Sequence, residues 1–268
     1  MAGSVGRVNI VERGSGRPVV LVHGFPVDHR SMLPLDGWLD EPGAWRRIYV
    51  DLPFVRGSDS SRAIESSDDV LAELVDTLDR LIGPDESYLV VGSSFGGLLS
   101  SRIAHDDPRV VGLALLEPAV IADHARRDVP PHVVLHEDPD ALAAVDPALA
   151  QEYAEMSVVQ SAEGLQVFAE SVHAGLEAAD PTVVARVEQK YSLSGGEAEL
   201  GYDGPTLVVT GRQDHVVGYQ DQLDLLDRYP RATFALLDSA GHNAHLERPD
   251  VVGALLRDWL VRVGAASD

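Results

Sequence analysis

One ten-residue stretch constrains the fold of this chain more than any other. Residues 88–97 read Tyr-Leu-Val-Val-Gly-Ser-Ser-Phe-Gly-Gly, and a run with helical character, 98–104, follows. This is a G-x-S-x-G motif between a strand and a helix, a context in which Ser94 stands on a sharp turn with its hydroxyl pushed outward. Gly92 and Gly96 omit the side chains that would collide with the flanking strand and helix. The first amides of the helix then point at the space beside Ser94, where negative charge can be stabilised.

Strand and helix patterns alternate through the first 119 residues. Strand-like runs occupy 7–12, 19–22, 47–50, 88–93 and 110–116. Apolar positions at helical spacing predict a helix over 68–82, with Ser66 or Ser67 as its N-cap. Strands that alternate with helices predict an α/β fold with a mostly parallel central sheet flanked by helices.

The alternation stops between residues 120 and 203. Three helical patterns, 148–159, 165–176 and 181–191, fill this stretch, and strand-like runs resume only at 206–210 and 233–237. A helical pattern over about 219–228 lies between those two runs, and another over 249–263 ends the chain. We therefore expect a core made of 1–119 and 204–268, interrupted by a helical cap at 120–203 that covers the carboxyl edge of the sheet.

Composition narrows the classes of partner. The chain carries 43 Asp and Glu against 21 Lys and Arg, a formal net charge of -22, which argues against nucleic acid and anionic membranes. It has no cysteine, so disulfides, thiolate nucleophiles and cysteine metal sites are excluded. The start lacks a signal-peptide pattern and no run is long enough to span a bilayer, so we expect a cytoplasmic protein.

A serine hydroxyl is a weak nucleophile that needs a base, and the base needs an acid to orient it. Asp214 follows the run 206–210, and His242 follows 233–237. Because the carboxyl ends of parallel strands meet at one edge of a sheet, we expect Ser94, Asp214 and His242 to converge there. Two rivals stay open: His245 as the base, and Glu117, which ends the run 110–116, as the acid.

Taken together, these motifs resemble the α/β-hydrolase superfamily over nearly the whole chain. The likeness is carried by His23-Gly24-Phe25-Pro26, Gly92-Ser93-Ser94-Phe95-Gly96-Gly97, Gly211-Arg212-Gln213-Asp214, Ala240-Gly241-His242 and Leu246-Glu247-Arg248-Pro249. The resemblance implies the α/β-hydrolase fold, with Ser94 as nucleophile, His242 as base and acid, and Asp214 as orienting carboxylate. It also implies an oxyanion hole formed by the backbone amides of Phe25 and Phe95. The chain looks most like single-domain enzymes with a helical cap, which include esterases, lactonases, cofactor-free haloperoxidases and C–C bond hydrolases.

The sequence departs from the family after Asp51, where relatives usually carry two glycines spaced one apart. Phe54 and Arg56 stand in that region, so a narrowed or charged pocket and a plain surface loop are both open. The candidate pocket residues are His23, Gly24, Phe54, Glu117 and Tyr153. Asp28-His29-Arg30 has three readings: contact with a polar substrate, a helix start or a salt bridge.

The expected activity is hydrolysis of a small carboxylic ester or lactone through an acyl-enzyme on Ser94. Three alternatives remain: a C–C bond hydrolase on the same triad, a cofactor-free lyase, oxygenase or cyclase that uses His242 as base, and a ligand receptor. No cofactor is implied, and His124, His132, His136 and His173 lack metal-ligand spacing, so no metal is expected. The expected partner is a small-molecule substrate, whose identity the sequence does not indicate, and the oligomeric state is equally open.

Overall fold

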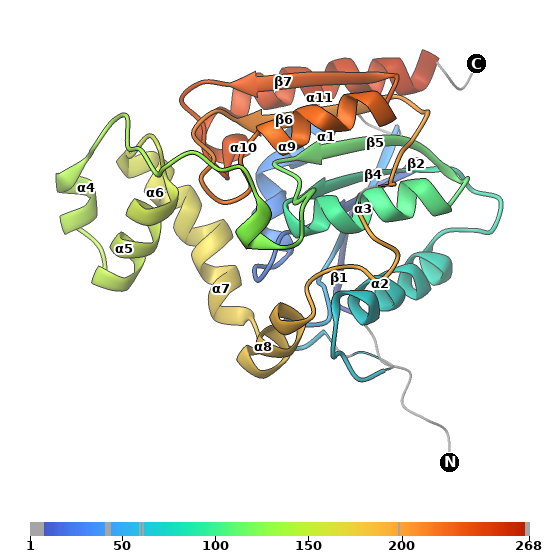
Figure 1. The fold of residues 1–268 in the computed structure, drawn as a ribbon, viewed down its shortest axis with the longest axis horizontal. Helices are drawn as coiled ribbons and strands as arrows, with labels where there is room; N and C mark the ends of the chain where they lie inside the picture. Colours follow the sequence, from blue (N-terminus) through green and yellow to red (C-terminus); the bar gives the residue numbers. More distant parts are fainter. Residues whose placement is uncertain (1–7, 41–43, 59, 61, 198, 266–268) are drawn as a thin grey trace.

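The computed structural model describes residues 8–40, 44–58, 60, 62–197 and 199–265, and Figure 1 shows its fold. Seven strands form one sheet in the order β1-β3-β2-β4-β5-β6-β7. β1 pairs antiparallel with β3, and every other pair is parallel, so the predicted mostly parallel sheet is confirmed. The strands are β1 (Ile10–Gly14), β2 (Arg17–Val22), β3 (Trp45–Val50), β4 (Tyr88–Ser93), β5 (Val110–Leu116), β6 (Thr206–Gly211) and β7 (Ala232–Leu237).

Helices cover both faces of the sheet, which is why its central strands are continuously apolar. Val20 and Val22 of β2 belong to one core cluster, together with side chains of α2 (Ser67–Leu81) and α3 (Phe95–Asp106). Val19 and Leu21 belong to the opposite cluster, with η1 (His29–Leu35), α1 (Asp36–Leu39) and α11 (Pro249–Ala265). Successive residues of a strand point to opposite faces, so β2 joins the two halves of the core.

The segment between β5 and β6 is helical, and its α-helices α4–α8 lie beside the sheet in Figure 1. Its own apolar cluster contains Tyr153, Leu165, Phe168 and Val172. The run predicted as one helix over 165–176 is in fact α6, a π-helical turn and α7 in succession. Elements here are η2 (His124–Arg126), α4 (Pro139–Ala143), α5 (Pro147–Met156), α6 (Ala162–Phe168), η3 (Ala169–His173), α7 (Ala174–Ala178) and α8 (Pro181–Gln189).

The remaining elements are α9 (Gln220–Leu223), η4 (Asp224–Arg228) and α10 (Ala244–Glu247). The parallel register brings the carboxyl ends of β2, β4, β5, β6 and β7 to one edge of the sheet. The candidate site residues follow those strand ends. No helix within the described ranges is both long and apolar enough to cross a bilayer. Residues 1–7, on which the expected localisation partly rests, lie outside these ranges.

Candidate active site

Ser94 occupies a strained turn between β4 and α3. Its backbone has φ 51° and ψ -116°, a conformation that few non-glycine residues adopt. The turn is held from both sides, because the Ser94 amide donates to the carbonyl of Leu116 at 3.0 Å and its carbonyl accepts from the amide of Ala119 at 3.0 Å. The strain is therefore stabilised by the neighbouring strand β5 and the loop that follows it.

The two glycines of the motif are required by close packing. A Cβ atom at Gly92 would lie 2.4 Å from the Gly96 carbonyl oxygen, and one at Gly96 would lie 2.2 Å from the Val22 carbonyl oxygen. Both distances are well inside van der Waals contact. The backbone of α3 can therefore start directly against β2 only when both positions lack side chains.

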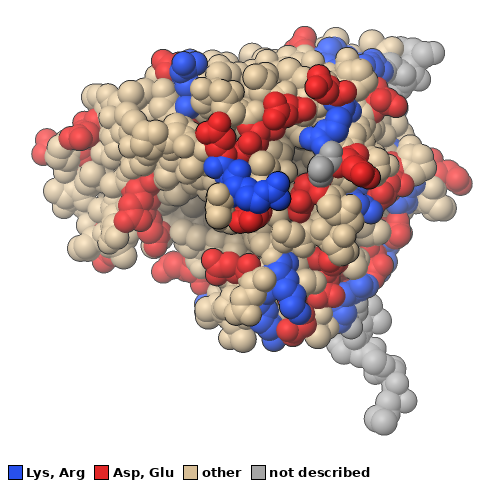
Figure 2. All heavy atoms as spheres, viewed as in Figure 1, with Lys and Arg blue, Asp and Glu red and all other residues tan. Residues whose placement is uncertain are grey.

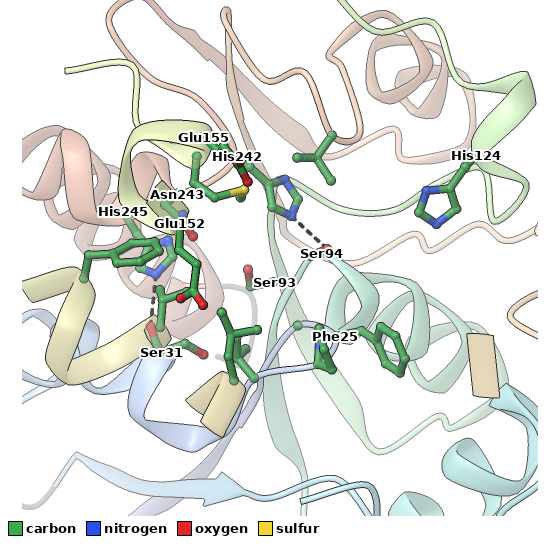
Figure 3. A pocket seen from close by; sticks show the side chains of 18 of the residues that line it. Phe25, Ser31, Ser93, Ser94, His124, Glu152, Glu155, His242, Asn243 and His245 are labelled. Atoms are coloured by element: carbon green, nitrogen blue, oxygen red, sulfur yellow. Dashed lines mark hydrogen bonds between the residues drawn. The ribbon is translucent and has the colours of Figure 1, made fainter. Parts of the chain in front are cut away.

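The three predicted residues Ser94, His242 and Asp214 meet at the edge of the sheet. His242 Nε2 lies 3.0 Å from Ser94 Oγ, and His242 Nδ1 lies 3.0 Å from Asp214 Oδ2. The contact between His242 and Ser94 is drawn in Figure 3. A carboxylate accepts hydrogen bonds, so Asp214 favours the tautomer in which Nδ1 carries the proton and Nε2 is free to accept from the serine hydroxyl.

Asp214 is itself rigidly placed. Its side chain is fully buried, and its Oδ1 accepts from the backbone amides of Val216 at 2.8 Å and Val217 at 3.0 Å. Its other oxygen is left for His242. These contacts fix the position of the carboxyl group, so Asp214 can hold the imidazole in one orientation.

Glu117, the other candidate acid, lies nearby without this support. It is completely buried at the end of β5, and neither carboxyl oxygen has a hydrogen bond of normal geometry within the described residues. Burial, then the charges of Asp214 and Glu247, raise the pKa of Glu117 well above its ordinary value. In the structure His242 therefore contacts Asp214 and not Glu117. The raised pKa of Glu117 favours the neutral form of its carboxyl group.

The loop after β2 passes close to Ser94. A Cβ atom at Gly24 would lie 3.2 Å from Ser94 Cβ. His23 anchors this loop from below, since its Nε2 accepts from the Leu52 amide at 2.9 Å and its Nδ1 lies 2.8 Å from the Gly24 carbonyl oxygen. Burial lowers the pKa of His23 and so favours the neutral ring that these contacts require. Phe25 thus lies beside the serine on a fixed backbone.

Phe95 approaches Ser94 from the other side. It is the first residue of α3, so its amide has no acceptor within the helix. Backbone amides at the start of a helix carry partial positive charge. The amide of Phe95, the residue directly after Ser94, belongs to this first turn of α3.

A cavity of about 300 Å³ opens over Ser94 and His242. Its floor comes from the sheet edge and its walls from the segment between β5 and β6, including α5, α6 and η3. Besides Ser94, His242, Gly24 and Phe25, it is lined by Pro26, Val27, Ser31, Ser93, His124, Arg127, Glu152, Glu155, Met156, Phe168, Val172, Leu176, Glu188, Tyr191, Val216, Asn243 and His245. Figure 3 shows Glu152, Asn243 and His245 on the same cavity as Ser93 and Ser94.

Of the five predicted pocket residues, only Gly24 lines this cavity. His23 is turned into the core, and Phe54 packs behind Phe25 with ring centroids 5.1 Å apart. Glu117 is buried beneath the histidine loop, and Tyr153 faces a second cavity. The pocket assignment of these four is corrected accordingly: His23, Phe54 and Glu117 lie just after strands and Tyr153 lies on α5, but none of the four side chains lines the cavity over Ser94.

The atypical loop after Asp51 fastens the sheet to the helical segment. Phe54 is fully buried, and its carbonyl accepts from the Asp180 amide at 2.8 Å. Arg56 donates to the Glu177 carbonyl at 2.9 Å. Neither side chain lines the cavity, so the loop neither narrows it nor charges it directly.

His245 takes a place that sequence reasoning missed. The sequence offers His245 as a rival base, but its Nε2 lies 3.0 Å from the Ser31 carbonyl oxygen, which fixes the ring away from Ser94 Oγ. Burial lowers the pKa of His245 to about 4, so the ring is neutral. Its Nδ1 has no hydrogen-bond partner among the described residues. His245 is therefore part of the cavity wall.

Asp28, His29 and Asp51 are the one group among the described residues whose ligand atoms lie close enough together to hold a metal ion. Each is already engaged: Asp28 accepts from the Arg30 amide and guanidinium, and His29 Nδ1 lies 2.8 Å from Asp51 Oδ1. Asp28 also caps η1. The cap at the start of η1 and the ion pair between Asp28 and Arg30 confirm the helix-start and salt-bridge readings.

Comparison with known proteins identifies a protein family that this chain matches. Residues 19–255 match the model of the alpha/beta hydrolase family. The chain is similar to esterase YbfF of Escherichia coli (strain K12), at 28% identity over 255 residues that cover 91% of this chain and 92% of that protein. It is similar to the 2-succinyl-6-hydroxy-2,4-cyclohexadiene-1-carboxylate synthase of Serratia proteamaculans (strain 568), at 27% identity over 82% of this chain and 85% of that one.

Among solved structures, an alpha/beta superfamily hydrolase from Oenococcus oeni PSU-1 superposes with a TM-score of 0.88 at 27% identity. The match covers 98% of this chain and 100% of that one. The superposition therefore includes the sheet, the helices on its faces and the segment between β5 and β6.

Proposed function

This chain belongs to the alpha/beta hydrolase family, and from that membership we propose that it is a serine hydrolase that cleaves a small carboxylic ester or lactone. The observation that carries the proposal is the pair of 3.0 Å contacts made by His242, one to Ser94 Oγ and one to Asp214 Oδ2. Nucleophile, base and orienting acid are the three groups that acyl transfer requires. The similarity to an esterase at 28% identity supports the same reaction class.

In this proposal, Ser94 Oγ attacks the substrate carbonyl while His242 Nε2 takes the hydroxyl proton. The amides of Phe25 and Phe95 stabilise the resulting oxyanion, an effect of about 3 kcal/mol per donor. His242 then gives its proton to the departing alcohol, and a water activated by the same ring hydrolyses the acyl-enzyme. Asp214 stabilises the imidazolium throughout.

We also propose that 120–203 acts as a cap. It supplies Glu152, Met156, Phe168 and Tyr191 to the cavity wall, so it helps determine which substrates fit. A closed cavity also excludes bulk water, which strengthens the electrostatic contacts with the oxyanion.

The test is hydrolysis of p-nitrophenyl acetate and butyrate by the wild type and three variants. We expect Ser94→Ala to abolish turnover and Asp214→Asn to lower kcat by about 10⁴-fold, because asparagine favours the wrong imidazole tautomer. Glu117→Gln is the matched control at the other strand-end acid and is expected to retain activity. Loss in Glu117→Gln with retention in Asp214→Asn would reverse the assignment of the acid.

The similarity to a synthase favours a second candidate, a non-hydrolytic reaction that uses His242 as base. It predicts negligible turnover of simple esters by the wild type. It also predicts little dependence of the native reaction on the Ser94 hydroxyl. Labelling of Ser94 by a fluorophosphonate probe together with rapid ester turnover would exclude this candidate.

A further inference from the structure

A second cavity of about 300 Å³ lies next to the one over Ser94. The two cavities share Phe168, Asn243 and His245 as lining residues, so these three form a wall between them. The far side of the wall is built from the end of α5, the 157–161 segment, α6 and α10. The catalytic cavity therefore has a neighbouring space into which it would open if the wall were removed.

Two members of the wall are fixed by polar contacts and one is not. His245 is held by the Ser31 carbonyl, and the backbone of Asn243, which precedes α10, is held because its carbonyl accepts from the Leu246 and Glu247 amides. Phe168 contributes only an aromatic ring, packed edge-on against Tyr153 with centroids 5.4 Å apart. Phe168 is 2% exposed and immediately precedes the π-helical turn η3. Its ring is thus the part of the wall that a substitution can remove.

The part of the cavity lining that packs with Phe168 is apolar, whereas Glu152 and Glu155 of α5 add carboxylates to the same cavity. Met156, Val172 and Leu176 form the apolar part, together with Val27. The opposite end carries His124 and Glu188, both exposed, and marks the opening to solvent. In an acyl-enzyme mechanism the alcohol must leave while the acyl group stays on the serine, so the apolar side chains beside Phe168 suit the acyl chain.

The second cavity can accept an apolar chain at little electrostatic cost. The hydroxyl of Tyr153 accepts from the Ser161 amide at 3.2 Å. The carboxylate of Glu247 accepts from the amides of Val158 and Gly241, both at 2.6 Å. Because these polar groups already have partners, an entering hydrocarbon would not leave them unsatisfied.

We propose that Phe168 sets the upper length of the acyl chain by closing the catalytic cavity off from the second one. The inference rests on the proposed ester hydrolysis and adds its specificity: short acyl chains end against the Phe168 ring, and longer ones collide with it. Phe168 touches the substrate's distal end and takes no part in bond making.

The experiment measures kcat/KM for p-nitrophenyl acetate, butyrate, hexanoate, octanoate and decanoate. We expect wild-type kcat/KM to fall beyond a short chain. Phe168→Ala should let the acyl chain extend into the second cavity and raise the ratio of kcat/KM for decanoate to that for acetate by roughly tenfold or more. Phe168→Leu, which keeps more of the packing, should give a smaller rise. Leu165→Ala is the matched control, because Leu165 is buried in the same apolar cluster and lines neither cavity.

An unchanged chain-length profile in both Phe168 variants, with acetate still hydrolysed, would overturn the inference, as would an equal shift in Leu165→Ala. Failure of the proposed function has a different signature, namely no ester turnover in the wild type. Calorimetric binding of 1-decanol and 1-butanol needs no turnover and tests the same space in that event. We expect Phe168→Ala to bind 1-decanol at least several-fold more tightly than the wild type, with 1-butanol unchanged. Equal binding of 1-decanol would also overturn the inference.

Discussion

Three carboxyl groups lie close together behind the histidine loop, and each is treated differently by its surroundings. Asp214 accepts hydrogen bonds from two backbone amides and from the His242 ring. One carboxylate oxygen of Glu247 accepts hydrogen bonds from the amides of Val158 and Val159, and the other accepts one from the amide of Gly241. Glu117 has no comparable donors, so the neutral form of this side chain is the favoured one.

The raised pKa of Glu117 predicts a pH-dependent stability. Its folded pKa lies above the ordinary value of 4.5, so its contribution to stability is present at low pH and is lost as pH rises from there through the folded pKa. Glutamine stays neutral at every pH. We expect the free energy of unfolding of the wild type, minus that of Glu117→Gln, to fall between pH 5 and pH 8. Each unit of pKa difference corresponds to about 1.4 kcal/mol.

Urea unfolding at the two pH values measures this difference. Titrating groups that do not interact with Glu117 are common to both proteins and cancel. A difference that does not change with pH would contradict the prediction, since it would mean that Glu117 has the same pKa in the folded and unfolded chains.

At the scale of elements, α2 illustrates how a local pattern is realised. The expected helix over 68–82 is observed as Ser67–Leu81, with Ser66 as its cap. The Ser66 hydroxyl accepts from the Asp69 amide at 3.3 Å and donates to the Asp69 carboxylate at 2.8 Å. The sequence left Ser66 and Ser67 as equal candidates, and the backbone at Ser66, which is extended, selects it.

This choice predicts that the two serines respond differently to substitution. Ser66→Ala removes the cap and should lower the free energy of unfolding by about 1 kcal/mol. Ser67→Ala is the control: its hydroxyl has no hydrogen-bond partner in the described structure, so a smaller loss is expected. Chemical denaturation of both variants gives the comparison. A larger loss of unfolding free energy in Ser67→Ala than in Ser66→Ala would contradict the assignment of Ser66 as the cap.

At the scale of the whole molecule, the excess of acidic groups sets a general repulsion. Acidic side chains are spread over the face in Figure 2, with basic ones among them, and the net charge of the chain is -22. Several basic groups are already paired, for example Arg47 with Asp36 and Arg109 with Asp79. The unbalanced remainder destabilises the compact state through self-repulsion.

We therefore expect salt to stabilise the fold. Raising NaCl from about 0.01 M to about 0.1 M shortens the Debye length from about 30 Å to about 10 Å, which screens the repulsion between distant charges. The thermal midpoint should rise by an amount on the order of 2 °C, as measured by calorimetry at constant pH. A fall would mean that screening of individual ion pairs outweighs relief of the net charge.

Much of this architecture is encoded locally. The turn at Ser94, the apolar strands and the caps depend on residues a few positions apart, because backbone conformation and side-chain periodicity are short-range properties. The meeting of Ser94, Asp214 and His242 at one edge follows as well, since a parallel sheet places all its strand ends together.

Other features depended on packing between distant segments. Glu117 and Asp214 both follow strands, and the tertiary positions of the loops after β6 and β7 decide that His242 contacts Asp214. Phe54 and Tyr153 pack away from the cavity, while Phe168 forms its wall. The positions of Phe54, Tyr153 and Phe168 depend on how the helices between β5 and β6 pack on the sheet. The periodicity of the sequence does not specify this packing, because it arises from contacts among residues far apart in the chain.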